Sequence, residues 1–139
     1  MGSVLDQFAG LDKQALSLWL DVTSRSVQAD GPDLTARQTA LMLTVYLEVG
    51  PHTVRSLAHK LGVGKPAIVR AIDTLGDAGL VTRVPDPHDR RSVFVIGTQN
   101  GASRLSTYAA SIARTIADIA KLDLHVTETS FSARDHQLA

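Results

Sequence analysis

The sequence predicts a mainly α-helical fold that carries one small β-hairpin. Apolar residues recur at helical spacing through most of the chain, and capping and stop signals divide them into five segments. Residues 80–96 combine β-branched residues with a turn rich in Pro and Asp. Because the chain has 139 residues, of which 44% are hydrophobic and 20% charged, we expect a single domain with its own core.

Composition excludes several kinds of protein and site. The chain has no cysteine, which excludes disulfides, thiolate metal ligands and cysteine nucleophiles. Its first ten residues show no basic segment followed by an apolar run, and its longest apolar stretch is too short to cross a bilayer. We therefore expect a cytoplasmic protein with no membrane partner.

The first helix is expected over residues 5–27, before the helix-breaking pair Gly31-Pro32. Its apolar residues fall at helical spacing, so they form one stripe along the helix. They are Phe8, Leu11, Ala15, Leu18, Trp19 and Val22.

Two short helices are expected next. The second helix begins at a capping box, Thr35 with Gln38 three residues later, and is stopped by Gly50-Pro51. Thr53 caps the third helix, and Gly62 supplies the turn that ends it.

The fourth helix is expected from Lys65 to about Ala78. Pro66 is tolerated in its first turn, and Gly79 ends it in a left-handed C-cap. The buried face is predicted by i, i+4, i+7 spacing of Ile68, Ile72 and Leu75. The side chains left to face outward are Lys65, Val69, Arg70 and Asp73.

A β-hairpin is expected directly after this helix. Val81, Val84 and residues 93–96 favour strands, whereas the residues between them favour a turn that ends in Arg90 and Arg91. The turn-forming residues are Pro85, Asp86, Pro87 and Asp89. The third and fourth helices, joined by a tight turn, have the arrangement of a helix-turn-helix. A hairpin placed directly after the fourth helix is then a wing.

A long fifth helix is expected from Thr98, its cap, to about Lys121. Its roughly two dozen residues would reach about 35 Å, which exceeds what a core of this size covers. Its apolar stripe comprises Leu105, Tyr108, Ala109, Ile112, Ile116 and Ile119. The helix is either an intramolecular cap or a dimerisation arm formed with the first helix. Residues 122–139 are polar without clear periodicity, and we expect a mostly disordered tail.

Charge is distributed unevenly along the chain although its net value is zero. Between positions 52 and 91 there are seven basic and four acidic residues, which leaves +3 there and −3 elsewhere. A basic segment in a neutral protein is consistent with one face that meets phosphate.

The order of these elements resembles the MarR family of dimeric winged-helix transcription regulators. The resemblance covers roughly residues 34–121 and rests on six motifs. They are Leu34-Thr35-x-x-Gln38, Leu57-Ala58, Val69-Arg70, Leu75-x-x-x-Gly79-Leu80-Val81, Asp86-Pro87-x-Asp89-Arg90-Arg91 and Thr98-x-x-Gly101.

The resemblance implies a winged helix-turn-helix with N- and C-terminal dimerisation helices. The dimerisation helices would span residues 5–30 and 98–121, the DNA-binding lobe residues 34–96 and the polar tail residues 122–139. The family usually has Leu just before the Thr that starts the fifth helix, where this chain has Gly97. We expect this difference to loosen the junction between the wing and the dimer arm.

The fourth helix is expected to read the major groove of DNA. Arg70 would bond a guanine or a phosphate, and Val69 and Pro66 would pack on thymine methyl groups. Lys65 and Arg55 are better placed for phosphates, where they add affinity without sequence information. The alternative for Arg70 is a solvated helix charge.

The wing is expected to enter a narrow, A·T-rich minor groove through Arg90 and Arg91. The resemblance implies that Arg91 is the inserted side chain. Asp89 is expected to brace an arginine rather than contact DNA, because phosphate would repel its carboxylate. Arg83, on a strand, and the exposed acids Asp73 and Asp77 are more simply interpreted as solvated charges.

Trp19 and Tyr46 have two interpretations. They are either core or dimer residues, or the lining of a site for a small aromatic effector, since the family often binds such ligands between the dimer helices and the DNA-binding lobe. The five His residues are scattered without metal-ligand spacing, and no catalytic or cofactor-binding motif is present. We expect no metal, no cofactor and no enzymatic activity.

The leading hypothesis is a homodimeric, sequence-specific DNA-binding transcriptional regulator, a ligand-responsive repressor that binds an inverted-repeat operator in double-stranded DNA. The alternative is a winged-helix protein-interaction module that does not bind DNA, because a fold does not fix a function and the net charge is zero. Steep salt dependence of binding separates the two hypotheses.

Overall fold

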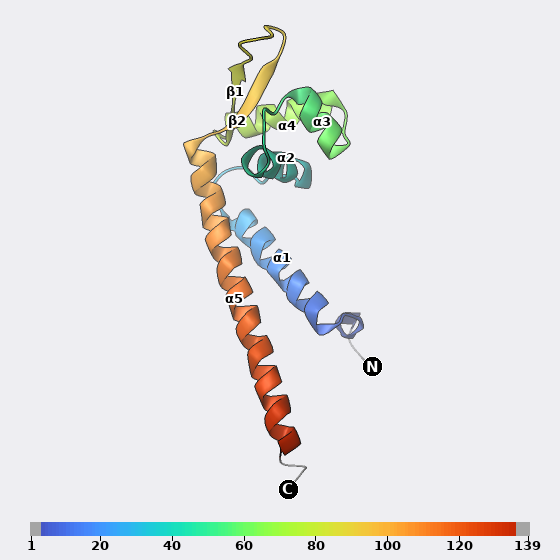
Figure 1. Cartoon of the computed structure of the whole chain (residues 1–139). Helices are drawn as coiled ribbons and strands as arrows, with labels where there is room; N and C mark the ends of the chain where they lie inside the picture. The colour runs from blue at the N-terminus through green and yellow to red at the C-terminus, as the bar shows by residue number, and fades with distance from the viewer. Residues whose placement is uncertain (1–3, 136–139) are drawn as a thin grey trace. The chain divides into compact units, whose positions relative to one another are not determined.

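A computed structural model describes the backbone of residues 4–135 and their side chains apart from Leu5 and residues 122–135 (Figure 1). A 3₁₀ turn, η1, precedes five helices and a two-stranded antiparallel hairpin, which confirms the predicted fold class. The elements are η1 Val4–Gln7, α1 Gly10–Gln28, α2 Ala36–Leu47, α3 Val54–Leu61, α4 Lys65–Asp77, β1 Val81–Pro85, β2 Val93–Gly97 and α5 Gln99–Asp135.

The elements group into two compact units. One unit, residues 29–106, contains α2, α3, α4, the hairpin and the first turns of α5. The other unit contains α1 and the remainder of α5.

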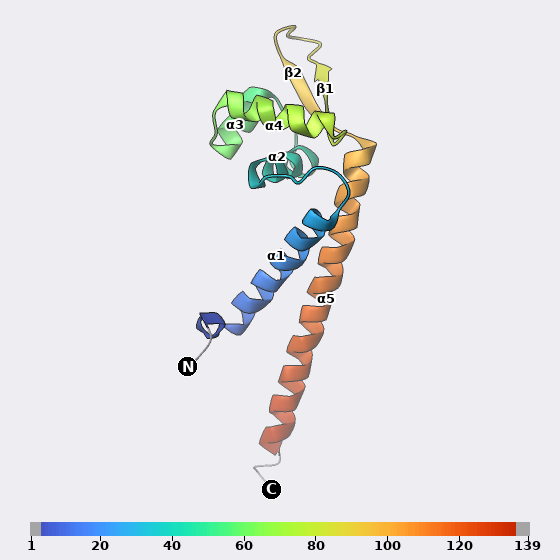
Figure 2. The ribbon, with the colours of Figure 1, turned by 180° about the vertical axis from the view of Figure 1, so that it is seen from behind.

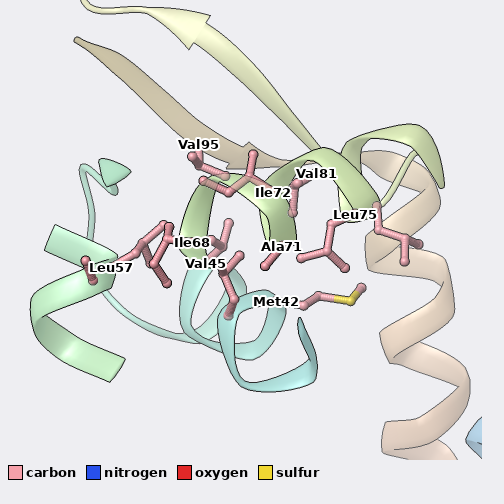
Figure 3. Close-up of a cluster of buried hydrophobic side chains, with 12 residues drawn as sticks. Met42, Val45, Leu57, Ile68, Ala71, Ile72, Leu75, Val81 and Val95 are labelled. Carbon is pink, nitrogen blue, oxygen red and sulfur yellow. The ribbon is translucent and has the colours of Figure 1, made fainter. Parts of the chain in front are cut away.

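The core of residues 29–106 is built from one face of each of α2, α3 and α4, closed by the base of the hairpin (Figure 3). The predicted α4 residues Ile68, Ile72 and Leu75 are all 0% exposed. They pack with a set of buried apolar residues that comprises Leu41, Met42, Val45, Leu57, Ala58, Ala71, Leu80, Val81 and Val95. This core fixes the orientation of α4, and therefore of its exposed face.

The predicted caps at Thr35, Thr53 and Gly62 are confirmed. The hydroxyl of Thr35 accepts a hydrogen bond from the backbone N–H of Gln38, whose side chain accepts one from Thr35 in return. Thr53 and Ser56 form the same reciprocal arrangement at α3. Gly62 ends α3 with φ 65°, in the left-handed region that favours glycine.

The hairpin follows directly on α4, as both views show (Figures 1 and 2). Its register runs from Val81 opposite Gly97 to Pro85 opposite Val93. Pro85, predicted as part of the turn, is the last residue of β1 instead, because an edge strand tolerates a residue without an N–H. The N–H of Val95 donates to the carbonyl of His52 over 2.8 Å, which joins β2 to the segment between α2 and α3.

Helix α5 is longer than the sequence predicts. We expected its end near Lys121 and a disordered tail after it, but the helix continues to Asp135. The polar composition of residues 122–135 contains no helix-stopping signal, since neither Gly nor Pro occurs after Gly101. The final part of the predicted tail, residues 136–139, lies outside the described residues.

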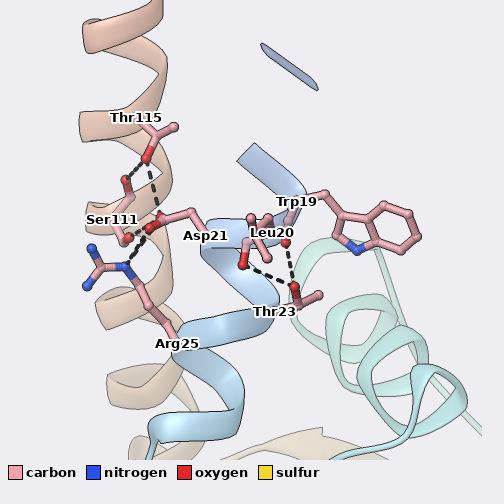
Figure 4. Close-up of polar contacts among 7 residues, drawn as sticks. All are labelled: Trp19, Leu20, Asp21, Thr23, Arg25, Ser111 and Thr115. Atoms are coloured by element: carbon pink, nitrogen blue, oxygen red, sulfur yellow. Dashed lines mark hydrogen bonds and ion pairs between the residues drawn. The ribbon is translucent and has the colours of Figure 1, made fainter. Parts of the chain in front are cut away.

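In the unit that contains α1 and the remainder of α5, a polar cluster around Asp21 joins the two helices (Figure 4). The Asp21 carboxylate accepts hydrogen bonds from Ser111 over 2.8 Å and from Thr115 over 3.3 Å. On its own helix it accepts one from Arg25 over 3.2 Å. The pKa of Asp21 is lowered, chiefly by the hydrogen bond from Ser111 and next by that from Arg25.

Candidate nucleic-acid interface

The exposed face of α4 presents the residues that the sequence predicts for base contact. Lys65, Pro66, Val69 and Arg70 are all exposed, whereas the opposite face is buried in the core. Gly64 caps the helix without a side-chain hydrogen bond, and the first turn of α4 contains no acidic residue. The positive end of the helix dipole is therefore not neutralised by an acid of α4 itself.

Helix α3 contributes a cation next to this face. Arg55 is exposed in the first turn of α3, just after the Thr53–Ser56 capping box. Because α3 and α4 pack together through Leu57 and Ile68, Arg55 belongs to the same folded unit as the exposed face of α4.

Two aspartates shape the loop between the strands. Asp86 accepts a hydrogen bond from the N–H of His88 over 2.8 Å, and Asp89 accepts one from the N–H of Arg91 over 2.9 Å. The Asp89 carboxylate thus braces the backbone of Arg91. Arg90 and Arg91 are both exposed at this loop, as the prediction of a wing requires.

An ion pair links α4 to β1, and the sequence analysis missed it. The Arg83 guanidinium lies 2.5 Å from a carboxylate oxygen of Asp73. The sequence alone favours solvated charges at both positions, because nothing in the local sequence connects residues ten positions apart. The signal in the sequence is that Arg83 lies two residues after Val81 on β1. Alternate residues of a strand share one face, so Arg83 lies on the same face as Val81.

Tyr46 lies at the junction between the hairpin and α5. Its hydroxyl donates to the carbonyl of Leu80 over 2.7 Å and accepts from the N–H of Thr98 over 2.8 Å. A Cβ added at Gly97 would lie 2.7 Å from the Tyr46 ring. The ring therefore packs closely against Gly97, where we expected a loosened junction. Thr98 also starts α5 as predicted, because its hydroxyl accepts from the N–H of Gly101.

Trp19 and Tyr46 belong to different units of the chain. Trp19 is 68% exposed on α1, whereas Tyr46 is half-buried beside the core of residues 29–106. The contacts of Tyr46 agree with the core interpretation of that residue. A shared effector site for the two residues stays a prediction.

The described part of the chain shows neither a metal cluster nor a membrane span. It contains no group of three or more His, Asp or Glu side chains arranged to hold a metal ion. None of its helices combines the length and the apolar character that crossing a membrane requires.

Two sequence comparisons agree with the geometry. Residues 34–93 match the model of the MarR family. Over 90 residues, covering 62% of this chain, the sequence is 34% identical to YcgE of Bacillus subtilis, which is named an uncharacterized HTH-type transcriptional regulator. The chain spans 58% of the length of that relative.

Two solved structures share the fold. A mutant of MepR from S. aureus bound to an oligodeoxyribonucleotide is 14% identical with a TM-score of 0.70, and the match covers 90% of this chain and 92% of that one. CouR from Rhodococcus jostii bound to p-coumaroyl-CoA is 21% identical with a TM-score of 0.56, covering 87% of each chain. At such identities the likeness shows the fold alone.

Proposed function

We propose that this chain is a member of the MarR family, whose model matches residues 34–93, and that it is a sequence-specific DNA-binding protein that represses transcription as a homodimer. Members of this family are transcriptional regulators and not enzymes. Binding to chromosomal DNA would place the chain in the cytoplasm.

The observation that carries the proposal is the set of exposed cations in residues 29–106. Arg70 and Lys65 lie on the exposed face of α4, and Arg90 and Arg91 lie in the hairpin loop that follows it. A helix start and a stiff loop that both present cations are suited to a major groove and an adjacent minor groove. MepR, which has this fold, was solved with an oligodeoxyribonucleotide.

The homodimer is supported by the apolar side chains of α1. None of its residues is buried in the described chain, and Leu11, Trp19 and Leu20 are 73%, 68% and 65% exposed. Large apolar side chains on one helix favour coverage by a partner. A two-fold dimer would carry two reading helices, so the operator should contain inverted half-sites about one helical turn apart.

The proposed signal is a small aromatic ligand near Trp19 and Tyr46. CouR was solved with p-coumaroyl-CoA, an aromatic acyl thioester. Since the Tyr46 hydroxyl already bonds Leu80 and Thr98, a ligand would meet its ring. A tenfold loss of DNA affinity needs about 1.4 kcal/mol of coupling between the two sites.

Titration of Trp19 fluorescence with simple aromatic acids, with and without operator DNA, tests this proposal. A ligand that binds the free protein and the operator-bound protein with equal affinity is ruled out as an effector.

The test of DNA binding starts from duplexes selected by the wild-type protein from a random pool. Binding should fall steeply with salt, with a log-log slope of about −5 to −9 for roughly six to ten phosphate contacts per dimer. A protein that selects no duplex, or binds independently of salt, would be the protein-interaction module that the net charge of zero allows.

Single substitutions then separate the two parts of the interface. Arg70→Ala should weaken binding by about 1–3 kcal/mol and relax preference at one position. Arg91→Ala should weaken binding most where the flanks of the site are rich in A·T. Arg114→Ala, an exposed arginine of α5, is the control and should leave affinity unchanged. Equal, sequence-blind losses from Arg70→Ala and Arg91→Ala would make Arg70 a phosphate contact.

A further inference from the structure

An acidic side chain lies on the face of α4 proposed to meet DNA. Asp73 is exposed, three and four residues after Arg70 and Val69, so the three side chains share one side of the helix. An isolated carboxylate there would repel the phosphates that Arg70 approaches. The presence of Asp73 on this face therefore needs a reason other than contact with DNA.

The partner of Asp73 belongs to the hairpin. Arg83 stands opposite Val95 in the register and two residues after Val81, and both of these valines are buried. Opposite and alternate residues share one face of a hairpin, so Arg83 lies on the inner face, toward α4. Its guanidinium reaches Asp73 at 2.5 Å.

The ion pair lies where the packed part of the hairpin ends. None of residues 82–94, all of which the structure describes, is buried, whereas Val81 and Val95 at the base belong to the core. The outer hairpin with Arg90 and Arg91 therefore extends beyond the core. The Asp73–Arg83 ion pair connects this extension to the reading helix.

We propose that the Asp73–Arg83 ion pair positions the wing against the reading helix, and so sets the spacing between Arg70 and the wing arginines when both contact DNA. The inference rests on the proposed DNA-binding function. Asp73 and Arg83 are positioning residues here: neither contacts the nucleic acid, and both act through the geometry of the wing.

Partial exposure makes the pair suited to this role rather than to folding. The side chains of Arg83 and Asp73 are 39% and 55% exposed. An ion pair this accessible to water contributes little to folding stability. Its loss should leave the unfolding midpoint nearly unchanged while it frees the outer hairpin.

Neutralising Asp73 gives opposite results under the two explanations. If Asp73 were only a charge beside phosphate, Asp73→Asn would tighten DNA binding. If Asp73 positions the wing, the same change should weaken binding, by roughly five- to thirtyfold when one weak ion pair is lost in each of two subunits. Asp77→Asn is the matched control, because it removes the same charge one turn later on α4 and should alter affinity by less than about twofold.

Footprinting on the selected duplex shows which contact is lost. Asp73→Asn should lose protection of the flanking minor groove from hydroxyl radicals and retain protection of guanine N7 from methylation. Asp73→Glu, which keeps the carboxylate, should retain both. In a double-mutant cycle, Asp73→Asn with Arg83→Gln should weaken binding no more than Arg83→Gln alone. Without DNA, backbone order parameters of residues 86–92 should fall in Asp73→Asn and not in Asp77→Asn.

The inference is overturned if Asp73→Asn binds as tightly as the wild type, or if its flanking protection is unchanged. If the wild-type protein selects no duplex, both the proposed function and this inference are wrong. If the wild type binds DNA but Asp73→Asn and Asp77→Asn have the same affinity, only this inference is wrong.

Discussion

At the residue scale, Tyr46 joins three segments that are distant in the sequence. Its hydroxyl bonds the carbonyl of Leu80, just after α4, and the N–H of Thr98, just before α5. The Thr98 hydroxyl in turn donates to the carbonyl of Gly79 over 2.6 Å. These bonds satisfy backbone groups between α4, the hairpin and α5, and they depend on close approach at Gly101.

Gly101→Ala should destabilise residues 29–106 through this junction. An added Cβ would overlap the Tyr46 hydroxyl and would lie too close to the carbonyl of Leu80. Overpacking of this kind costs about 1–3 kcal/mol or more, and urea unfolding measures it. The control is Gly10→Ala, because a Cβ at Gly10 meets nothing within 4 Å. Equal stability of the two variants would contradict the close packing at Gly101.

At the element scale, Asp21 forms polar contacts between α1 and α5. Its carboxylate accepts from Ser111 and Thr115 of α5 and from Arg25 of α1. Each of these donors favours the ionised acid, which is why the pKa of Asp21 is lowered. The pairing of the two helices is therefore sensitive to acid.

The pH dependence has a definite sign. Because the pKa of Asp21 is lower in the folded than in the unfolded chain, its ionised form contributes stability above the ordinary aspartate pKa of about 4. This contribution is lost as the pH falls through the folded pKa. The difference in unfolding free energy between wild type and Asp21→Asn should be constant at neutral pH and shrink below about pH 4. A difference that stays constant down to pH 2 would contradict the lowered pKa.

Local and long-range features were not equally predictable. The caps at Thr35 and Thr53 could be predicted because both partners lie within three residues. The partners of Tyr46 lie 34 and 52 residues away, so only the folded chain reveals them. The predicted end of α5 was wrong, because polar residues weaken the apolar periodicity of a helix without stopping it.

At the scale of the whole molecule, the unpartnered apolar residues of α1 and α5 favour self-association. Ile116 is 53% exposed on α5, and α1 has no buried residue in the described chain. In a homodimer these side chains would lie against the second copy, where an unpaired charge is costly.

Ile116→Glu should therefore produce a monomer or an unfolded chain. Sedimentation at micromolar concentration distinguishes both forms from the dimer that we expect of the wild type. Gln99→Glu, which adds a charge at the exposed first position of α5, should remain dimeric. A wild type that sediments as a monomer would remove the dimer from the proposal.

The turn bonds of the hairpin loop also bear on its resistance to proteolysis. Trypsin cleaves after arginine, and Arg90 and Arg91 are exposed, yet a protease needs its substrate locally unfolded and extended. Asp86 and Asp89 hold this segment in tight turns through the N–H groups of His88 and Arg91. Cleavage here should be slow in the free protein, faster when both aspartates are changed to alanine, and suppressed by operator DNA. Electrophoresis of the fragments measures all three rates.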